Sequence, residues 1–197
     1  LWSAYLGGSD LDQPHSMDCD ENGNLYVFGL TGSSDFPTTA GAADTTFGGG
    51  NSADIEFFTF QNGTDMFVCS ISSNGAQLMG STYLGGSYNE GFNDSLRFNY
   101  GDGFRGEIEV QRDGGPVYIA ATADSIDYPI TPGATKHQGG LDGVLTVLPR
   151  NLGPLIYSTY LGTSGHEAFY SLILTSKEGN AVSYTHLRAH ETPSHRV

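Results

Sequence analysis

A short motif that recurs at nearly constant spacing constrains the fold of this chain more than any other feature. Residues 5–9, 83–87 and 160–164 each begin Tyr-Leu-Gly, and their starting points lie 78 and 77 residues apart. A second motif, Asp-aromatic-Pro, recurs at residues 35–37 and 127–129. Motifs that return in the same order indicate tandem copies of one structural unit, which buries its apolar faces against its neighbours.

Each unit contains four short segments that are rich in Val, Ile, Tyr, Phe and Thr and bounded by Gly, Asn, Asp or Pro. This composition is typical of β-strands joined by tight turns. The segments are 15–18, 25–31, 66–71 and 77–84 in the first complete unit, and 107–111, 117–122, 143–148 and 155–161 in the second. Four antiparallel strands repeated in tandem describe the blade of a β-propeller. The sequence therefore predicts an all-β β-propeller fragment, with two four-stranded blades plus parts of two others.

The repeat also divides the chain into blades. We expect the last strand of a preceding blade at residues 1–9, blade 1 at 10–87, blade 2 at 88–164 and the start of blade 3 at 165–181. On this division the third blade stops after one strand.

The composition changes abruptly after residue 181, where His and basic residues become frequent. Residues 182–192 resemble the translation of a transposase sequencing adaptor, so we interpret residues 182–197 as a non-native tail and expect it outside the sheets. The alternative is a zinc site formed by His186, His190 and His195, since His at i and i+4 on a helix can chelate zinc. The adaptor match accounts for every residue from 182 to 192, so we favour it over the zinc site.

The motifs and their order resemble the SBBP repeat of bacterial β-propeller proteins. The residues that carry the resemblance are Gly-Asn-Leu-Tyr-Val-Phe-Gly at 23–29, the Ser-x-Asp-Phe-Pro-Thr-Thr loop at 33–39, Asp-Met-Phe-Val at 65–68 and Tyr-Ser-Thr-Tyr-Leu-Gly at 157–162. The resemblance covers residues 1–181. It implies a scaffold in a large secreted or surface-exposed protein, and it implies no reaction.

Charge and motif content exclude several classes of function. The net charge of −14 argues against binding of nucleic acid, whose phosphates require a basic surface. No apolar run is long enough to span a membrane. No Gly-x-Ser-x-Gly nucleophile motif is present, and carboxylate pairs arise by chance in so acidic a chain. We therefore expect no enzyme activity and no cofactor.

One segment matches the opening of a calcium-binding loop. Asp18, Asp20 and Asn22, followed by Gly23, fit the pattern D-x-D-x-N-G, which gathers oxygen ligands around a sharp turn. The twelfth position, which should be a bidentate Glu, is Gly29. We favour an ordinary polar hairpin turn over this weak calcium candidate and expect no metal site.

The two units differ most in two segments, 48–64 and 89–105. The first contains Phe57, Phe58 and Phe60, which are weak candidates for a binding surface because loops that vary on a rigid scaffold often carry function. The Asp-aromatic-Pro loops, in contrast, occur in both units, so we expect them to pack between blades.

These observations favour a non-catalytic repeat scaffold or interaction module of a secreted or cell-surface bacterial protein. Its expected partners are the neighbouring blades of the same chain, with an extracellular protein or a polysaccharide as external candidates. The alternative is a propeller-based carbohydrate-binding or carbohydrate-active enzyme domain whose site lies on blades outside this sequence.

Overall fold

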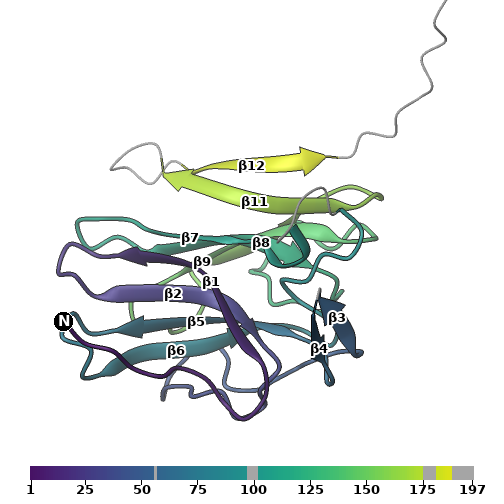
Figure 1. The fold of residues 1–197 in the computed structure, drawn as a ribbon. Coiled ribbons are helices and arrows are strands. Elements are labelled where there is room, and N and C mark those ends of the chain that lie inside the picture. The colour runs from purple at the N-terminus through teal and green to yellow at the C-terminus, as the bar shows by residue number, and fades with distance from the viewer. Residues whose placement is uncertain (56, 97–101, 175–180, 188–197) are drawn as a thin grey trace, which may run out of the picture.

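Two four-stranded antiparallel sheets form most of the described part of the chain, which covers residues 1–55, 57–96, 102–174 and 181–187. The computed structural model stacks these sheets on each other, with a third sheet beyond the second (Figure 1). Blade 1 consists of β1 (Asp12–Cys19), β2 (Leu25–Thr31), β5 (Asp65–Ile71) and β6 (Leu78–Leu84), and blade 2 of β7 (Glu107–Val110), β8 (Val117–Ala123), β9 (Asp142–Leu148) and β10 (Tyr157–Leu161). Within each sheet the strands pair in chain order, so the predicted all-β propeller fragment is confirmed.

The remaining elements are short. The third sheet contains β11 (Glu167–Leu174) and β12 (Ala181–Leu187), and a small hairpin of β3 (Ala53–Ile55) and β4 (Phe58–Phe60) interrupts blade 1 between β2 and β5. A single turn of 3₁₀ helix, η1 (Asp102–Phe104), precedes β7. Among the described residues, no helix has the length and apolar character needed to cross a bilayer.

Both faces of the central strands are covered. In β2, every residue from Tyr26 to Thr31 is buried, although side chains alternate between the two faces of a strand. Such near-continuous apolar strands are typical of sheets that lie between two layers. The stacking of blades therefore explains why β2 reads as an unbroken apolar run.

The structure differs from the sequence-based expectation at both ends of the chain. Residues 1–9 were expected to be a strand, but they form none, because a strand requires a hydrogen-bonded partner and none of the described strands pairs with them. Instead, the Trp2 indole N–H donates to the carbonyl oxygen of Ser73 at 3.0 Å.

The expectations that the third blade ends after one strand and that residues 182–187 lie outside the sheets were both wrong. β12 pairs antiparallel with β11 over its whole length, from Ala181 opposite Leu174 to Leu187 opposite Glu167. An unpaired strand edge offers a row of backbone donors and acceptors, and a following segment rich in Val, Tyr and Thr is suited to satisfy it. The adaptor origin of residues 182–192 stays a prediction, and residues 188–197 lie outside the described part of the chain.

The main core lies between the two blades. Blade 1 contributes one face of its sheet and blade 2 the opposing face, and the buried side chains include Phe28, Leu30 and Val68 from the first and Ile119 and Val144 from the second. These residues are nearly or fully inaccessible to solvent. Burial of apolar area from both sheets is therefore the main source of stability at this interface.

Leu30 shows how closely the blades approach. Gly91, from the segment that leads into blade 2, has a φ of +66°, and a Cβ at this position would lie 2.1 Å from a Leu30 methyl carbon. A side chain at residue 91 would thus be strained and would clash with Leu30. Glycine is required where blade 2 passes over Leu30.

We expect Leu30→Ala to lower the free energy of unfolding by about 2–5 kcal/mol, because it leaves a cavity between the blades. Urea denaturation followed by circular dichroism measures this change. The matched control is Ile126→Ala, where the side chain is 72% exposed, and the expected change is within about 0.5 kcal/mol. Equal effects at the two positions would contradict the stacked arrangement.

Candidate functional site

A carboxylate holds the Tyr-Leu-Gly loop in each of the three units. The backbone N–H of Gly8 donates to Asp12 at 2.7 Å, and that of Gly86 donates to Glu90 at 2.8 Å. In the third unit, the N–H of Thr163 donates to Glu167 at 2.7 Å. Each acid follows its donor by four residues. These three acids therefore have one structural role, repeated by the chain.

The Asp-aromatic-Pro loop contacts the same segment. Asp35 accepts hydrogen bonds from the backbone N–H and the hydroxyl of Ser9 at 2.8 and 2.9 Å. In the next unit, Asp127 accepts the same pair from Ser87 at 2.9 and 3.0 Å. A Cβ on Gly8 would lie 2.5 Å from the Asp35 carboxylate, so the close approach requires glycine. The repeated motifs thus bind one another and fix the loops at one end of each blade.

The aromatic residues of these loops are buried. The Phe36 ring lies 4.4 Å from that of Phe67, and Tyr128 packs into the core between the blades with its hydroxyl 2.8 Å from Thr146. The Tyr160 hydroxyl donates to the carbonyl oxygen of Ser125. Tyr128 thus packs between the two blades, as we expected for these loops, whereas the described contacts of Phe36 lie within its own blade, against Phe67 and Tyr83.

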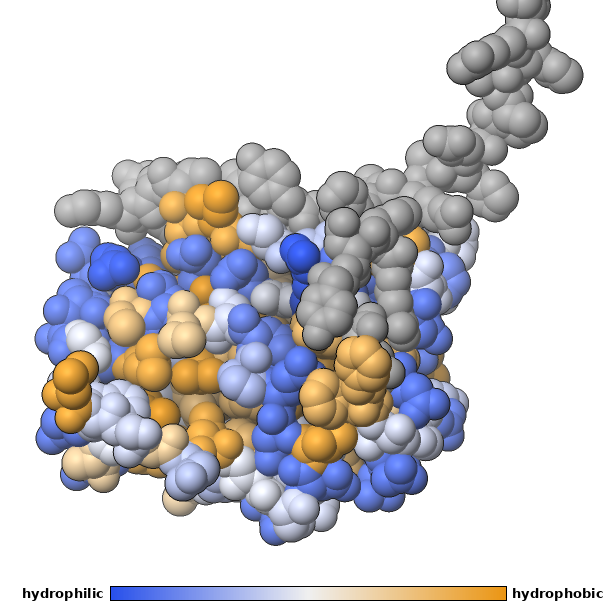
Figure 2. Space-filling view, viewed as in Figure 1, coloured by the Kyte–Doolittle hydropathy of each residue, from blue (hydrophilic) through white to orange (hydrophobic). Residues whose placement is uncertain are grey.

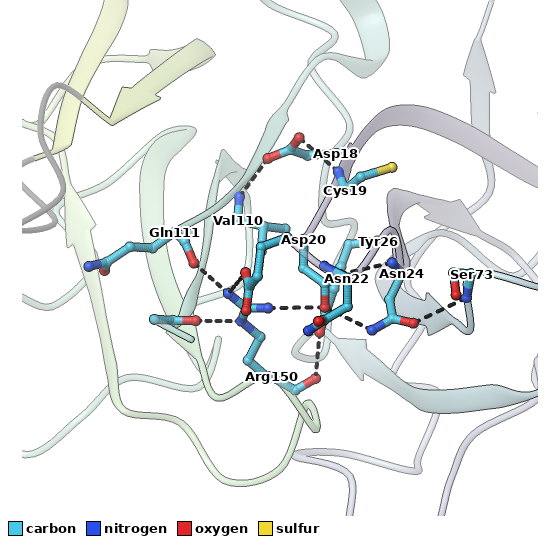
Figure 3. A network of polar contacts seen from close by, with 12 residues as sticks. Asp18, Cys19, Asp20, Asn22, Asn24, Tyr26, Ser73, Val110, Gln111 and Arg150 are labelled. Carbon is cyan, nitrogen blue, oxygen red and sulfur yellow. Dashed lines mark hydrogen bonds and ion pairs between the residues drawn. The ribbon is translucent and has the colours of Figure 1, made fainter. Parts of the chain in front are cut away.

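The calcium candidates lie at the contact between the blades (Figure 3). Arg150, in the turn between β9 and β10, donates to Asp20 at 3.0 Å and to Glu21 at 2.8 Å. The same guanidinium donates to the carbonyl oxygens of Gly115 and Gln111 at 2.7 and 2.6 Å. One side chain thus ties the β1–β2 turn of blade 1 to the β7–β8 turn of blade 2.

The acids of the candidate calcium loop are engaged in this network. Burial would raise the pKa of Asp20, but hydrogen bonds from Asn24 and Asn22 and the charge of Arg150 lower it overall. Asp18 accepts the backbone N–H of Val110 at 2.9 Å, again across the blades. The backbone N–H of Asn22 donates to Asp20 at 2.9 Å. A cation would have to compete with Arg150 for Asp20, and the described residues contain no cluster of three or more His, Cys, Asp or Glu suited to a metal.

The phenylalanines of the insert separate into two environments. Phe60, on β4, is buried, whereas Phe57 is 87% exposed and Phe58 is 46% exposed. Figure 2 shows apolar residues gathered where Figure 1 places this hairpin. Phe60 therefore anchors the hairpin, and the other two present apolar surface to solvent.

A further group of residues was not predicted from the sequence. His15, Asn93 and Tyr170 occupy the same position in three successive units, by the spacings of 78 and 77. His15 and Tyr170 lie at the register shifts of β1 and β11, where a bulge re-aims a side chain. In the second unit, Asn93 lies outside the strands, and the first strand of this unit is β7, which begins at Glu107. We call the described residues 94–96 and 102–106 the excursion.

Hydrogen bonds tie the excursion to the third sheet. The Asn93 side-chain amide donates to the Tyr170 hydroxyl at 3.1 Å and to the carbonyl oxygens of Leu96 and Asp102 at 2.9 and 3.2 Å. The Tyr170 hydroxyl donates to the Leu96 carbonyl oxygen at 2.5 Å. The sequence signal was the difference in spacing between the two landmarks, which showed a longer segment at 89–105 but not its contact with Tyr170.

Two buried acids, Asp65 and Glu90, accept hydrogen bonds from loops, and their burial favours the protonated, uncharged form. Burial raises the pKa of Asp65 to about 7, although the N–H groups of Gly48 and Gly49 donate to its carboxylate and oppose the shift. Burial likewise raises the pKa of Glu90 to about 8, against hydrogen bonds from Ser125 and Gly86. Both groups bind protons in the folded protein at pH values where the unfolded chain has released them.

We expect Arg150→Met to lower the free energy of unfolding by about 1–3 kcal/mol, because Asp20 loses a charged partner at a buried contact. Arg112→Met is the matched control, since Arg112 is 64% exposed and lies 3.7 Å from Asp18, and it should cost less than about 1 kcal/mol. Calcium titration of the wild type should show no site tighter than about millimolar. Micromolar calcium binding that Asp20→Ala abolishes would contradict this assignment.

Stability should fall as the pH rises from 6.5 to 8.5. His15, whose pKa burial lowers to about 4, is neutral in the folded protein across this range but partly protonated in the unfolded chain near pH 6.5, which adds a smaller rise in stability. The raised pKa values of Asp65 and Glu90 act in the opposite direction, outweigh this rise and determine the sign of the slope. Urea denaturation at several pH values measures it. Asp65→Asn should flatten the slope, while Asp54→Asn, at an exposed position, should leave it unchanged. A stability that rises over this range would disprove the assignment.

The comparison with known families agrees with the geometry. Residues 1–37 match the family model described as the SBBP beta-propeller repeat. The matched span contains the first Tyr-Leu-Gly-Gly-Ser motif, β1, β2 and the start of the loop that carries Asp35. No curated protein matches the chain. Residues 1–37 therefore carry the SBBP β-propeller repeat.

Proposed function

We propose that this chain is a non-catalytic repeat scaffold that serves as an interaction module of a secreted or cell-surface bacterial protein. The observation that carries the proposal is the use of acidic side chains as structural groups. Asp12, Glu90 and Glu167 hold equivalent loops, and Asp35 and Asp127 hold the adjoining segments. Carboxylates committed to backbone N–H groups in every unit are poorly suited to act as a general acid or a nucleophile.

Two further features support an interaction role. The stacked sheets are a rigid support, and the β3–β4 hairpin presents exposed Phe57 and Phe58 on it. Exposed aromatic side chains on a loop of a rigid scaffold are typical of protein contact surfaces. An extracellular protein or a polysaccharide is the partner class that we propose.

The extracellular location rests on composition and on the repeat itself. The chain has 22 acidic and only 8 basic residues, a balance that keeps an exposed protein soluble and repels nucleic acid. The resemblance to repeats of large secreted bacterial proteins points the same way. Because an acidic balance occurs in proteins of several compartments, antibody labelling of intact cells tests the location.

Antibodies raised against the full chain should label intact cells of the source bacterium or its culture medium. A cytoplasmic enzyme detected in parallel is the control for lysis. The purified chain should hydrolyse a panel of chromogenic glycosides no faster than buffer does. Label confined to lysed cells would refute the proposed location, and glycoside turnover by the purified chain would refute the non-catalytic role.

A further inference from the structure

A cavity of about 370 Å³ lies at the first strands of the three sheets, beside the excursion. Its walls come from β1, from the residues around the start of β7 and from β11, so all three units contribute to it. The side chains used below are His15, Ser16, Phe104, Arg105, Glu107 and Tyr170. Because the excursion occurs in the second unit but not in the first, this cavity is not a repeated feature of the blades.

His15 is the unexplained group in this cavity. Both ring nitrogens are buried, and neither has a hydrogen-bond partner among the described residues. The ring instead packs against aromatic neighbours, with centroids 6.0 Å from Phe28 and 5.2 Å from Phe104. A neutral imidazole carries one donor and one acceptor, and buried polar groups are nearly always satisfied by protein, water or ligand. His15 thus offers an unused donor and an unused acceptor.

The other walls combine balanced charge with aromatic surface. Glu107 accepts a hydrogen bond from the Ser16 hydroxyl. Arg105 pairs with Asp102 at 3.0 Å, and its guanidinium carbon lies 5.9 Å from the centre of the Tyr170 ring. The cavity lining therefore contains one acid and one base, so it has no excess of either sign to attract an ion. Phe104 and Tyr170 add apolar area.

We propose that this cavity binds a neutral, hydroxyl-rich ligand, a sugar unit of a polysaccharide. A hydroxyl group both donates and accepts, so a turn of the buried His15 ring towards the cavity on binding lets adjacent hydroxyls satisfy its donor and its acceptor while others meet Glu107 and Arg105. The C–H face of a sugar ring is suited to pack on Phe104 or Tyr170. The volume lies within the range of small-molecule sites.

The sugar site goes beyond the scaffold role, which requires no ligand at this position. The test is saturation-transfer NMR on the full chain with four probes: glucose, galactose, mannose and N-acetylglucosamine, each at millimolar concentration. At least one sugar should receive saturation from the protein and shift the imidazole ¹⁵N signals of His15. His15→Phe keeps an aromatic ring in place but removes both nitrogens, so it should weaken that binding at least tenfold.

The same variant gives a second readout. Since His15→Phe removes two unsatisfied buried nitrogens, Tm should rise by about 2–4 °C while sugar binding is lost. The control is Tyr157→Phe, outside the cavity and 44% exposed, which should bind the sugar as the wild type does. If His15→Phe does not fold, Glu107→Gln is tested in its place, and it should weaken sugar binding at least threefold.

The absence of saturation transfer to all four sugars in the wild type would overturn the sugar site. Equal binding by the wild type and by the folded cavity variant would overturn it too. Neither result bears on the scaffold role, which is tested by location and by the glycoside assay.

Discussion

The packing of one sheet against the next is the interaction on which the rest of this structure depends. Leu30 and Val68 of blade 1 meet Ile119 and Val144 of blade 2 in one buried cluster. A four-stranded sheet with two apolar faces cannot remain folded in water alone, because each face needs a cover. This need explains why the unit is repeated, why β2 is apolar throughout and why Gly91 lies against Leu30.

The acidic composition follows from how the loops are held. Glycine-rich loops leave backbone N–H groups without a strand partner, and carboxylates accept them at Asp12, Glu90 and Glu167. Where such an acid is buried, as at Asp65 and Glu90, the protein holds it at a raised pKa. At the blade contact, Arg150 instead supplies a positive charge to Asp20 and Glu21. Much of the charge that looked available for chemistry is therefore structural.

Departures from the repeat are the places where function is expected. The carboxylates that accept the N–H groups of the Tyr-Leu-Gly loops occur at the same place in successive units. A feature present in every unit is explained by the architecture alone. The β3–β4 hairpin and the excursion each occur in one blade, and groups that the fold does not use lie on the hairpin and beside the excursion. These groups are Phe57 and Phe58 on the hairpin, and the two nitrogens of His15 in the cavity beside the excursion. Both departures lie on the rigid support of the blades.

The sequence by itself determined the repeat, the strands and the blade order, because the β-branched and aromatic content of the strands and the turn residues that bound them are local properties of the chain. β2 was predicted to the residue, and the core strands of both blades to within a few residues. It did not predict the pairing of β12 with β11, the contact of Arg150 with Asp20 or the meeting of His15 with Tyr170 at one cavity. Arg150 and Asp20 are far apart in the chain and meet across two blades, so only the packing of the sheets decides the contact. For the same reason Asp20, a weak calcium candidate in the sequence, is the partner of an arginine in the fold.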